Sequence, residues 1–171
     1  MGLISNGTTL LDAGALDSGI ATGDMILIKT LTASSSANLT FVHGTSSVVL
    51  DGTYKSYVFK YINIHPASVA QLTVNFRDGG TDYDATKTST AFNPYHQEDD
   101  SDADIIYREA WDLAQGTGDQ IIAQELGNGA DESASGYLHL FNPSSTTFVK
   151  HFIASMSACH ASDFHVQSHI A

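Results

Sequence analysis

The stretch from Gly136 to Met156, GYLHLFNPSSTTFVKHFIASM, constrains the fold of this chain more than any other. Residues 137–141 place side chains alternately on two sides, as a strand does. Residues 142–145, Asn-Pro-Ser-Ser, favour a tight turn, because proline fixes φ while Asn and Ser bond to the nearby backbone. Residues 146–156 are β-branched, aromatic and apolar, which predicts a second strand. Two strands joined by a tight loop indicate an antiparallel sheet.

The richest strand signal is YKSYVFKYINI, which runs from Tyr54 to Ile64. One face of this strand carries three aromatic rings, those of Tyr57, Phe59 and Tyr61. The other face carries aliphatic side chains, those of Val58, Ile62 and Ile64. Because both faces are apolar, we expect a central strand, or one that lies beneath a subunit interface.

Other short segments repeat the strand pattern between turn residues. The segments predicted as strands are 25–30, 37–42, 48–50, 71–77, 83–92, 120–126 and 164–170. Asp51-Gly52 and residues 78–81, Asp-Gly-Gly-Thr, predict hairpin turns between them. Short strands at this spacing are typical of an antiparallel β-sandwich or a jelly-roll-like fold.

The stretch 93–119 departs from this rhythm. An acidic run, Glu98 to Asp104, is followed by apolar residues that would share one face of a helix: Ile106, Tyr107, Ala110, Trp111, Leu113 and Ala114. Ser101 or Asp102 would cap the start of such a helix and Gly116 its end. We therefore expect an all-β fold with at most one short helix.

The chain divides into an arm and a domain. Residues 1–24 alternate turn residues with short apolar pieces, which predicts an extended, irregular N-terminal arm. Two interpretations remain: a mobile terminus, or a docking arm, which the high aliphatic content favours and whose contacts would include Leu10, Leu11 and Leu16. Residues 25–171 are predicted to form a single β-sandwich domain. Because the sequence stops at Ala171 on an apolar step, we expect that a final C-terminal hairpin is missing.

The charge balance excludes some partners. The chain has 19 acidic residues and 7 basic residues, for a formal net charge of −12. A phosphate backbone would be repelled by this field, so we expect no nucleic-acid partner. No window approaches the ~20 apolar residues of a membrane span, so we expect no membrane insertion. The single cysteine, Cys159, excludes an internal disulfide and a thiolate metal cluster.

Asp100, Asp102 and Asp104 have the D-x-D-x-D spacing that opens a calcium loop. Ile105 and Trp111 stand where an EF-hand requires glycine and glutamate, so the segment is not an EF-hand. Two interpretations remain: a looser calcium site, or a solvated acidic turn, which such a charge run forms more often. A structural calcium ion is the one cofactor considered.

The eight histidines do not form an evident site in the sequence. His165 and His169 share a strand face but lie about 13 Å apart at the usual strand rise, too far to share one metal. A metal site would need His151 or His160 from a neighbouring segment or subunit. The alternative is that these histidines lie at the edge of the core or at an interface and bind no metal. The sequence contains no G-x-S-x-G, P-loop or H-E-x-x-H motif, and we expect no enzyme.

Four segments carry a resemblance that covers most of the chain. They are GLISNGTTLLDAGAL, YVFKYINIHPA, YHQEDDSDAD and GYLHLFNPSSTTFVKHFIA, of which the last is the most specific. Together they resemble a family of structural proteins from tailed phages of marine bacteria, of the kind labelled structural or tail-fibre protein. The resemblance implies a virion component and brings no catalytic residues. Similar members usually continue beyond the position of Ala171 with a further β-hairpin.

The resulting expectation is a non-enzymatic structural protein on the surface of a phage particle, as a capsid decoration or head fibre or as a tail or fibre component. It would associate with other virion proteins and with copies of itself, in a trimer by the usual symmetry of fibres. The N-terminal arm and Tyr57, Phe59 and Tyr61 are the expected contacts.

Two alternatives remain open. A receptor-recognition module would bind host glycans near Tyr95, Trp111 or Tyr137, with calcium at Asp100–Asp104. A depolymerase ranks last, because nothing in the sequence places two carboxylates across a groove.

Overall fold

The computed structural model describes residues 3–5, 8–12, 15–16, 25–162 and 164–171. The chain forms two compact units, Met1–Val49 and Leu50–Ala171. All strand pairings in the described residues are antiparallel and these residues contain no helix, which confirms the all-β fold class. The division at residue 49 lies further along the chain than the predicted end of the arm at residue 24.

In the first unit, the part of the chain that the structure describes includes one small sheet. Its strands are β1 (Leu3–Ser5), β2 (Thr8–Asp12) and β3 (Ala15–Leu16), in the order β1-β2-β3. Residues 25–49, all of which the structure describes, form turns, bends and irregular chain without a strand. The strands predicted at 25–30, 37–42 and 48–50 are therefore wrong. The first was predicted as buried, yet Leu27 is 82% exposed: an apolar run alone does not supply a partner strand.

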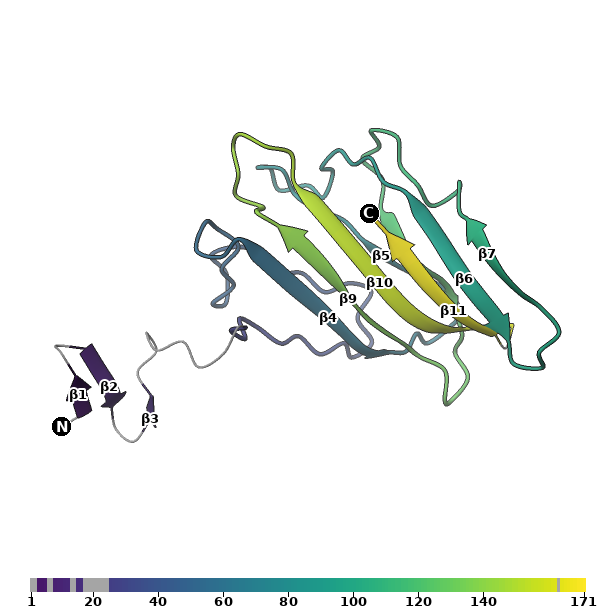
Figure 1. The fold of residues 1–171 in the computed structure, drawn as a ribbon, viewed down its shortest axis with the longest axis horizontal. Helices are drawn as coiled ribbons and strands as arrows, with labels where there is room; N and C mark the ends of the chain where they lie inside the picture. The colour runs from purple at the N-terminus through teal and green to yellow at the C-terminus, as the bar shows by residue number, and fades with distance from the viewer. Residues whose placement is uncertain (1–2, 6–7, 13–14, 17–24, 163) are drawn as a thin grey trace. The chain divides into compact units, whose positions relative to one another are not determined.

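The described residues of the second unit form eight strands. They are β4 (Ser56–Ile64), β5 (Ala70–Val74), β6 (Ala91–Gln97), β7 (Ala103–Tyr107), β8 (Gln120–Leu126), β9 (Ala134–Phe141), β10 (His151–His160) and β11 (Phe164–Ile170). Six of them form the front sheet, in the order β4-β9-β10-β11-β6-β7. Figure 1 shows the front sheet in this order, with β5 behind it.

The remaining two strands form the second layer. β5 pairs with β8, and β8 meets the front sheet through one register pair, Leu126 and His160. The side chains enclosed between the layers form the core: Ala91, Trp111, Ile122, Ala123, Leu126, Ala134, Leu138, Leu140, Ala154, Met156, Ala158 and Ile170. We call the side of the front sheet that carries these residues the inner face and its opposite side the outer face.

The strand–loop–strand unit predicted between Gly136 and Met156 is confirmed as β9 and β10, although its bounds shift. The two strands pair from Phe141 and His151 at one end to Ala134 and Ala158 at the other. Residues 146–150 belong to the loop and not to the strand. The Ser145 hydroxyl accepts hydrogen bonds from the backbone N–H groups of Thr147 (3.3 Å) and Phe148 (3.0 Å), which holds the chain in a turn there.

β4 confirms the strand predicted at 54–64, but not its central position. It ends the strand order of the front sheet. Its register with β9 shifts between Tyr61 and Ile64, where Asn63 has φ of 50° and its N–H donates to Ser135 Oγ. This bulge returns Ile64 to the core, while Ile62 is left 71% exposed. The central position is therefore wrong, whereas a place beneath a subunit interface stays a prediction.

The stretch 83–119 contains no helix, so the candidate helix after the acidic run does not form, in agreement with at most one short helix in the fold. The partner strand predicted at 83–92 lies instead at Ala91–Gln97, as β6, and β7 pairs with it along Ala103–Tyr107. After β7 the chain makes a turn in which Arg108 O accepts from the N–H of Trp111 at 2.9 Å. Leu113 then pairs with Ser89 through reciprocal contacts. The apolar residues with helical spacing therefore belong to an edge strand, β7, and to the turn after it. They do so because β6 supplies backbone hydrogen-bond partners for β7.

The inner face is tightly packed around Gly136. Gly136 lies opposite Tyr61 of β4 and Met156 of β10. A Cβ atom added there would come within 2.3 Å of the backbone oxygen of Ser155 and 2.6 Å of Met156 Sδ. The close approach of these neighbours therefore requires glycine.

Candidate interaction surface

The outer face of the front sheet carries the largest group of exposed apolar side chains in this unit. Strand alternation turns every second residue toward it. Six of its large apolar residues remain exposed: Ile62, Phe92, Ile105, Tyr107, Tyr137 and Ile153. The outer face is turned toward the viewer in Figure 1.

Strand register arranges part of this surface as one continuous row. The row crosses all strands of the front sheet through successive register pairs: Lys60, Tyr137, Ser155, His169, Phe92 and Tyr107. We call this set the outer row. A neighbouring row contains Val58, His139 and Ile153. Lys60 and Tyr137, and likewise His169 and Phe92, thus lie side by side although each pair is 77 positions apart in sequence.

The rings of this face pack on one another. Phe92 stacks on His169 with 5.2 Å between ring centroids. Tyr137 meets His139 edge to face, also at 5.2 Å. These contacts preorganise an aromatic surface while leaving Phe92 45% and Tyr137 44% exposed. Rigid, half-exposed aromatic side chains are the type that contributes most at protein interfaces.

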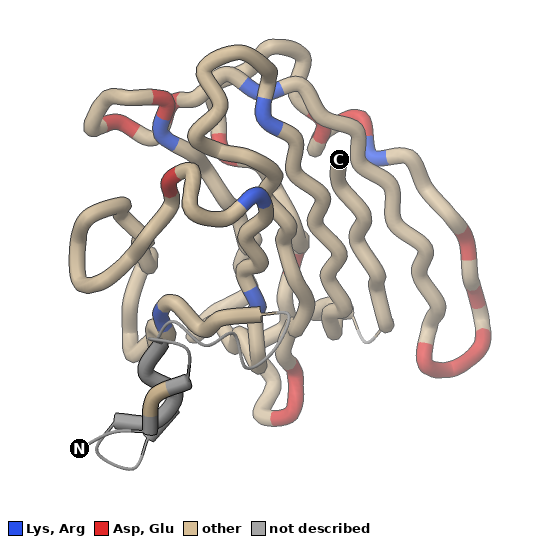
Figure 2. Tube along the Cα trace, turned by 60° about the vertical axis from the view of Figure 1, so that its left-hand side comes forward, with Lys and Arg blue, Asp and Glu red and all other residues tan. Residues whose placement is uncertain are grey.

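Charge is distributed unevenly around the front sheet. Its six strands contain one acidic residue, Asp104, although the chain has 19. Asp104 is paired with Tyr95, whose ring contacts Phe164 on the inner side. Figure 2 shows Asp and Glu gathered in loops, with the strands mostly free of them. Carboxylates therefore surround the outer face, as with Asp112, which accepts a hydrogen bond from the Tyr107 hydroxyl.

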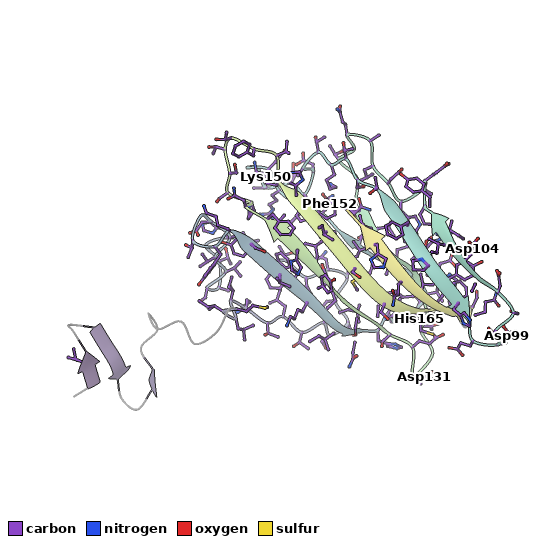
Figure 3. The ribbon with its side chains drawn as sticks, viewed as in Figure 1. Asp99, Asp104, Asp131, Lys150, Phe152 and His165 are labelled. Carbon is purple, nitrogen blue, oxygen red and sulfur yellow. The ribbon has the colours of Figure 1, made fainter. Side chains whose placement is uncertain are left out.

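A polar hollow lies at one end of the outer face. Its lining includes Asp131, Ser135, Ser157, Cys159 and His165. Ser157 Oγ and His165 Nε2 are 3.5 Å apart, the longest separation of a hydrogen bond. Figure 3 labels Asp131 and His165 near this end. Among the described residues no carboxylate hydrogen-bonds to His165, so the serine and histidine lack the third group that orients a catalytic base.

The three aspartates predicted as calcium ligands make separate contacts. Asp100 Oδ1 lies 3.1 Å from His96 Nε2, and Asp102 Oδ2 accepts from the Tyr95 hydroxyl at 2.6 Å. The latter bond raises the pKa of Tyr95. Asp104 Oδ1 accepts from the N–H of Ile105 at 2.7 Å. No group of three His, Cys, Asp or Glu side chains in the described part of the chain could hold a metal ion, and calcium here stays a prediction.

The predicted interface residues fall into two sets. The side chains of Leu10, Leu11 and Leu16 lie outside the described residues. Tyr57 is buried, and Phe59 and Tyr61 pack against the core. Contact of a partner with these three rings stays a prediction, but the rings already stabilise the inner face. The exposed apolar residue of the same strand is Ile62, on the other side.

The aromatic residues proposed for glycan contact are also separated. Trp111 is buried in the core, with its Nε1–H donating to Gln124 Oε1 at 2.7 Å. Tyr95 is half-buried, and only Tyr137 lies exposed on the outer face. The sequence showed that His165 and His169 share a face, yet it did not place Phe92, Tyr107 and Tyr137 there with them. Which of these residues are neighbours depends on the register between strands, and the sequence pattern of one strand does not give that register.

The described residues include no helix of the length and apolarity that a membrane crossing needs. Comparison of the chain with protein-family models, with curated proteins and with solved structures finds no significant match.

Proposed function

We propose that this chain is a non-enzymatic structural protein of a tailed bacteriophage particle, which associates with copies of itself on the virion surface. The proposal begins from the resemblance of the segment GYLHLFNPSSTTFVKHFIA, which here forms most of β9, the loop after it and the start of β10. A module of this kind acts by burying surface, and repeated copies make weak individual contacts sufficient.

The exposed outer face is the observation that supports the proposal best. Tyr107 is 51% exposed and Ile153 48% exposed on a sheet face without carboxylates of its own. Contiguous apolar surface of this kind usually marks a site of protein association. The hollow beside Ser157 and His165 offers no comparable support for catalysis, because its serine and histidine have no orienting carboxylate in the described chain.

Mass spectrometry of purified phage particles tests the virion role. The chain should be present at a fixed copy number per particle, and antibodies against it should label intact particles in the electron microscope. Label over the head would indicate a decoration protein, and label at the tail would indicate a fibre component. Absence of the chain from purified particles would contradict the proposal.

The alternative function is recognition of host surface glycans. The observation that favours it is the pair of half-exposed tyrosines on the outer face, Tyr107 and Tyr137, because aromatic rings stack on sugars. A glycan array with the purified chain, with and without calcium, tests it. Binding that Tyr137→Ser abolishes would establish this alternative, whereas an array without signal would count against it.

A further inference from the structure

We infer that a second copy of this chain binds the outer face of the front sheet through the same face, with the outer row at the centre of the contact. The inference rests on the self-association in the proposed function and specifies its surface. Contact between identical faces produces a two-fold dimer, in place of the trimer expected from the sequence.

The first argument is size. The outer row crosses five strand spacings of about 4.8 Å each, and a strand such as β9 has 8 residues at a rise of about 3.3 Å. The face therefore covers on the order of 600 Å² before side-chain relief is added. A stable interface buries about 800 Å² per partner. The outer face thus comes near to the area that one dimer contact needs.

The second argument is charge. Two copies with a net charge of −12 each repel one another, and most surfaces would bring carboxylates together. Asp104, the one acidic residue in the front-sheet strands, pairs with Tyr95 and not with the outer row. Contact through the outer face therefore buries no unpaired carboxylate of these strands. The loop acids, such as Asp100, stay at the rim in solvent.

The third argument is the pattern of the outer row. Its ends carry Lys60 and Tyr107, and its centre carries Ser155 and His169, flanked by the rings of Tyr137 and Phe92. In a two-fold contact the centre of one row faces the centre of the other, so rings and small polar groups meet. An antiparallel arrangement of the rows would bring Lys60 of each copy toward the Tyr107 end of the other. The hydroxyl of Tyr107 already bonds to Asp112, which supplies an opposite charge there.

Sedimentation equilibrium of the full chain near neutral pH tests the inference. Ile153→Glu places a carboxylate on the outer face, where Ile153 is 48% exposed. Val149→Glu is the matched control, because Val149 is 77% exposed but belongs to the β9–β10 loop. We expect the wild type and Val149→Glu to reach twice the chain mass with equal affinity. Ile153→Glu should associate roughly a hundredfold more weakly.

Tyr137→Ser provides a milder variant if Ile153→Glu fails to fold. It removes a half-exposed ring of the outer row, so we expect association about tenfold weaker. Circular dichroism and the thermal midpoint establish that each variant is folded before its mass is measured.

The outcomes separate this inference from the proposed function. A dimer that neither outer-face variant weakens, or a trimer, would overturn the outer-face contact while self-association stands. A wild-type chain that remains monomeric would overturn the contact with a second copy. Glycan binding that depends on Tyr137, in place of association, would overturn it as well. The presence of the chain in purified particles tests the virion role separately, whichever of these outcomes is found.

Discussion

The two faces of the front sheet are built from the same strands and the same alternation, yet their environments differ. On the inner face Leu138 and Ala154 are fully buried against the second layer formed by β5 and β8. On the outer face Tyr137 and Ile153, their neighbours in sequence, remain half-exposed. One residue of displacement along a strand thus separates a core position from a surface position. The comparison teaches that apolar character alone did not decide burial; the layer behind the sheet did.

The largest expected difference between the faces comes from truncation in the core. Leu138→Ala should lower the free energy of unfolding by about 2–5 kcal/mol, because it leaves a cavity beneath a fully buried side chain. Urea denaturation followed by circular dichroism measures this loss. A loss as small as that of a surface substitution would show that the second layer does not cover this position.

A second prediction adds volume to the inner face. Gly136→Ala should destabilise the fold by about 1–3 kcal/mol, because the new Cβ would lie 2.3 Å from the Ser155 backbone oxygen. Gly118→Ala is its control, since a Cβ there meets nothing within 4 Å. Equal thermal midpoints for the two variants would contradict the tight packing of β9 against β10.

The third prediction uses alkaline pH to probe the inner face. Burial raises the pKa of Tyr61 to about 12, against an ordinary value near 10. The unfolded chain therefore loses this proton first, and stability falls as pH rises from about 10 toward about 12. Tyr61→Phe should remove that part of the loss. Stability profiles of the two proteins that stay parallel above pH 10 would sink the assignment of a buried Tyr61.

A fourth prediction concerns the edge of the core under acid. His160 Nε2 lies 2.8 Å from Glu125 Oε2, and its ring stacks on Phe164 with centroids 3.9 Å apart. Burial lowers the pKa of His160 and outweighs the opposing effect of Glu125. The unfolded chain therefore binds the proton more readily, and stability declines as pH falls below about 6.5.

His160→Gln tests this edge because glutamine cannot gain the charge. Its stability should change less between pH 7 and pH 5 than that of the wild type, as measured by thermal unfolding across pH. A His160→Gln slope that matches the wild type would exclude His160 as a source of acid sensitivity.

The smallest effect is expected on the outer face. Ile153→Ala should change the free energy of unfolding of the monomer by less than about 1 kcal/mol, because half of the side chain already contacts solvent. Its unfolding is best measured at low concentration, where association does not add stability. A loss comparable with that of Leu138→Ala would mean that some part of the chain covers the outer face.

Two strands could be predicted from the sequence to the residue, whereas the helical spacing after the acidic run did not produce a helix. Residues 120–126 and 164–170 form β8 and β11 with the predicted bounds. The run from Ile106 to Ala114 had helical spacing but became β7 and a turn, because β6 offered backbone partners. Local spacing competes with tertiary pairing, and in a short segment the pairing decides.

The candidate surface was only half visible in the sequence. Alternation placed His165 and His169 together, and it assigned Tyr57, Phe59 and Tyr61 to one face of β4. It did not reveal which face would be buried, so those three rings were expected at an interface, while Ile62 was expected to be covered. Which face of β4 is buried and which is exposed depends on where β5 and β8 lie.

The sequence by itself determined the all-β class, the β9–β10 unit and the net charge of −12, because these follow from local propensity and composition. Only the tertiary structure decided the outer row, since register brings Tyr137, His169 and Phe92 together from three strands. It also decided which face is the core. Both faces of a strand are exposed to water until another layer packs on one of them, and burial of that face is what makes it the core.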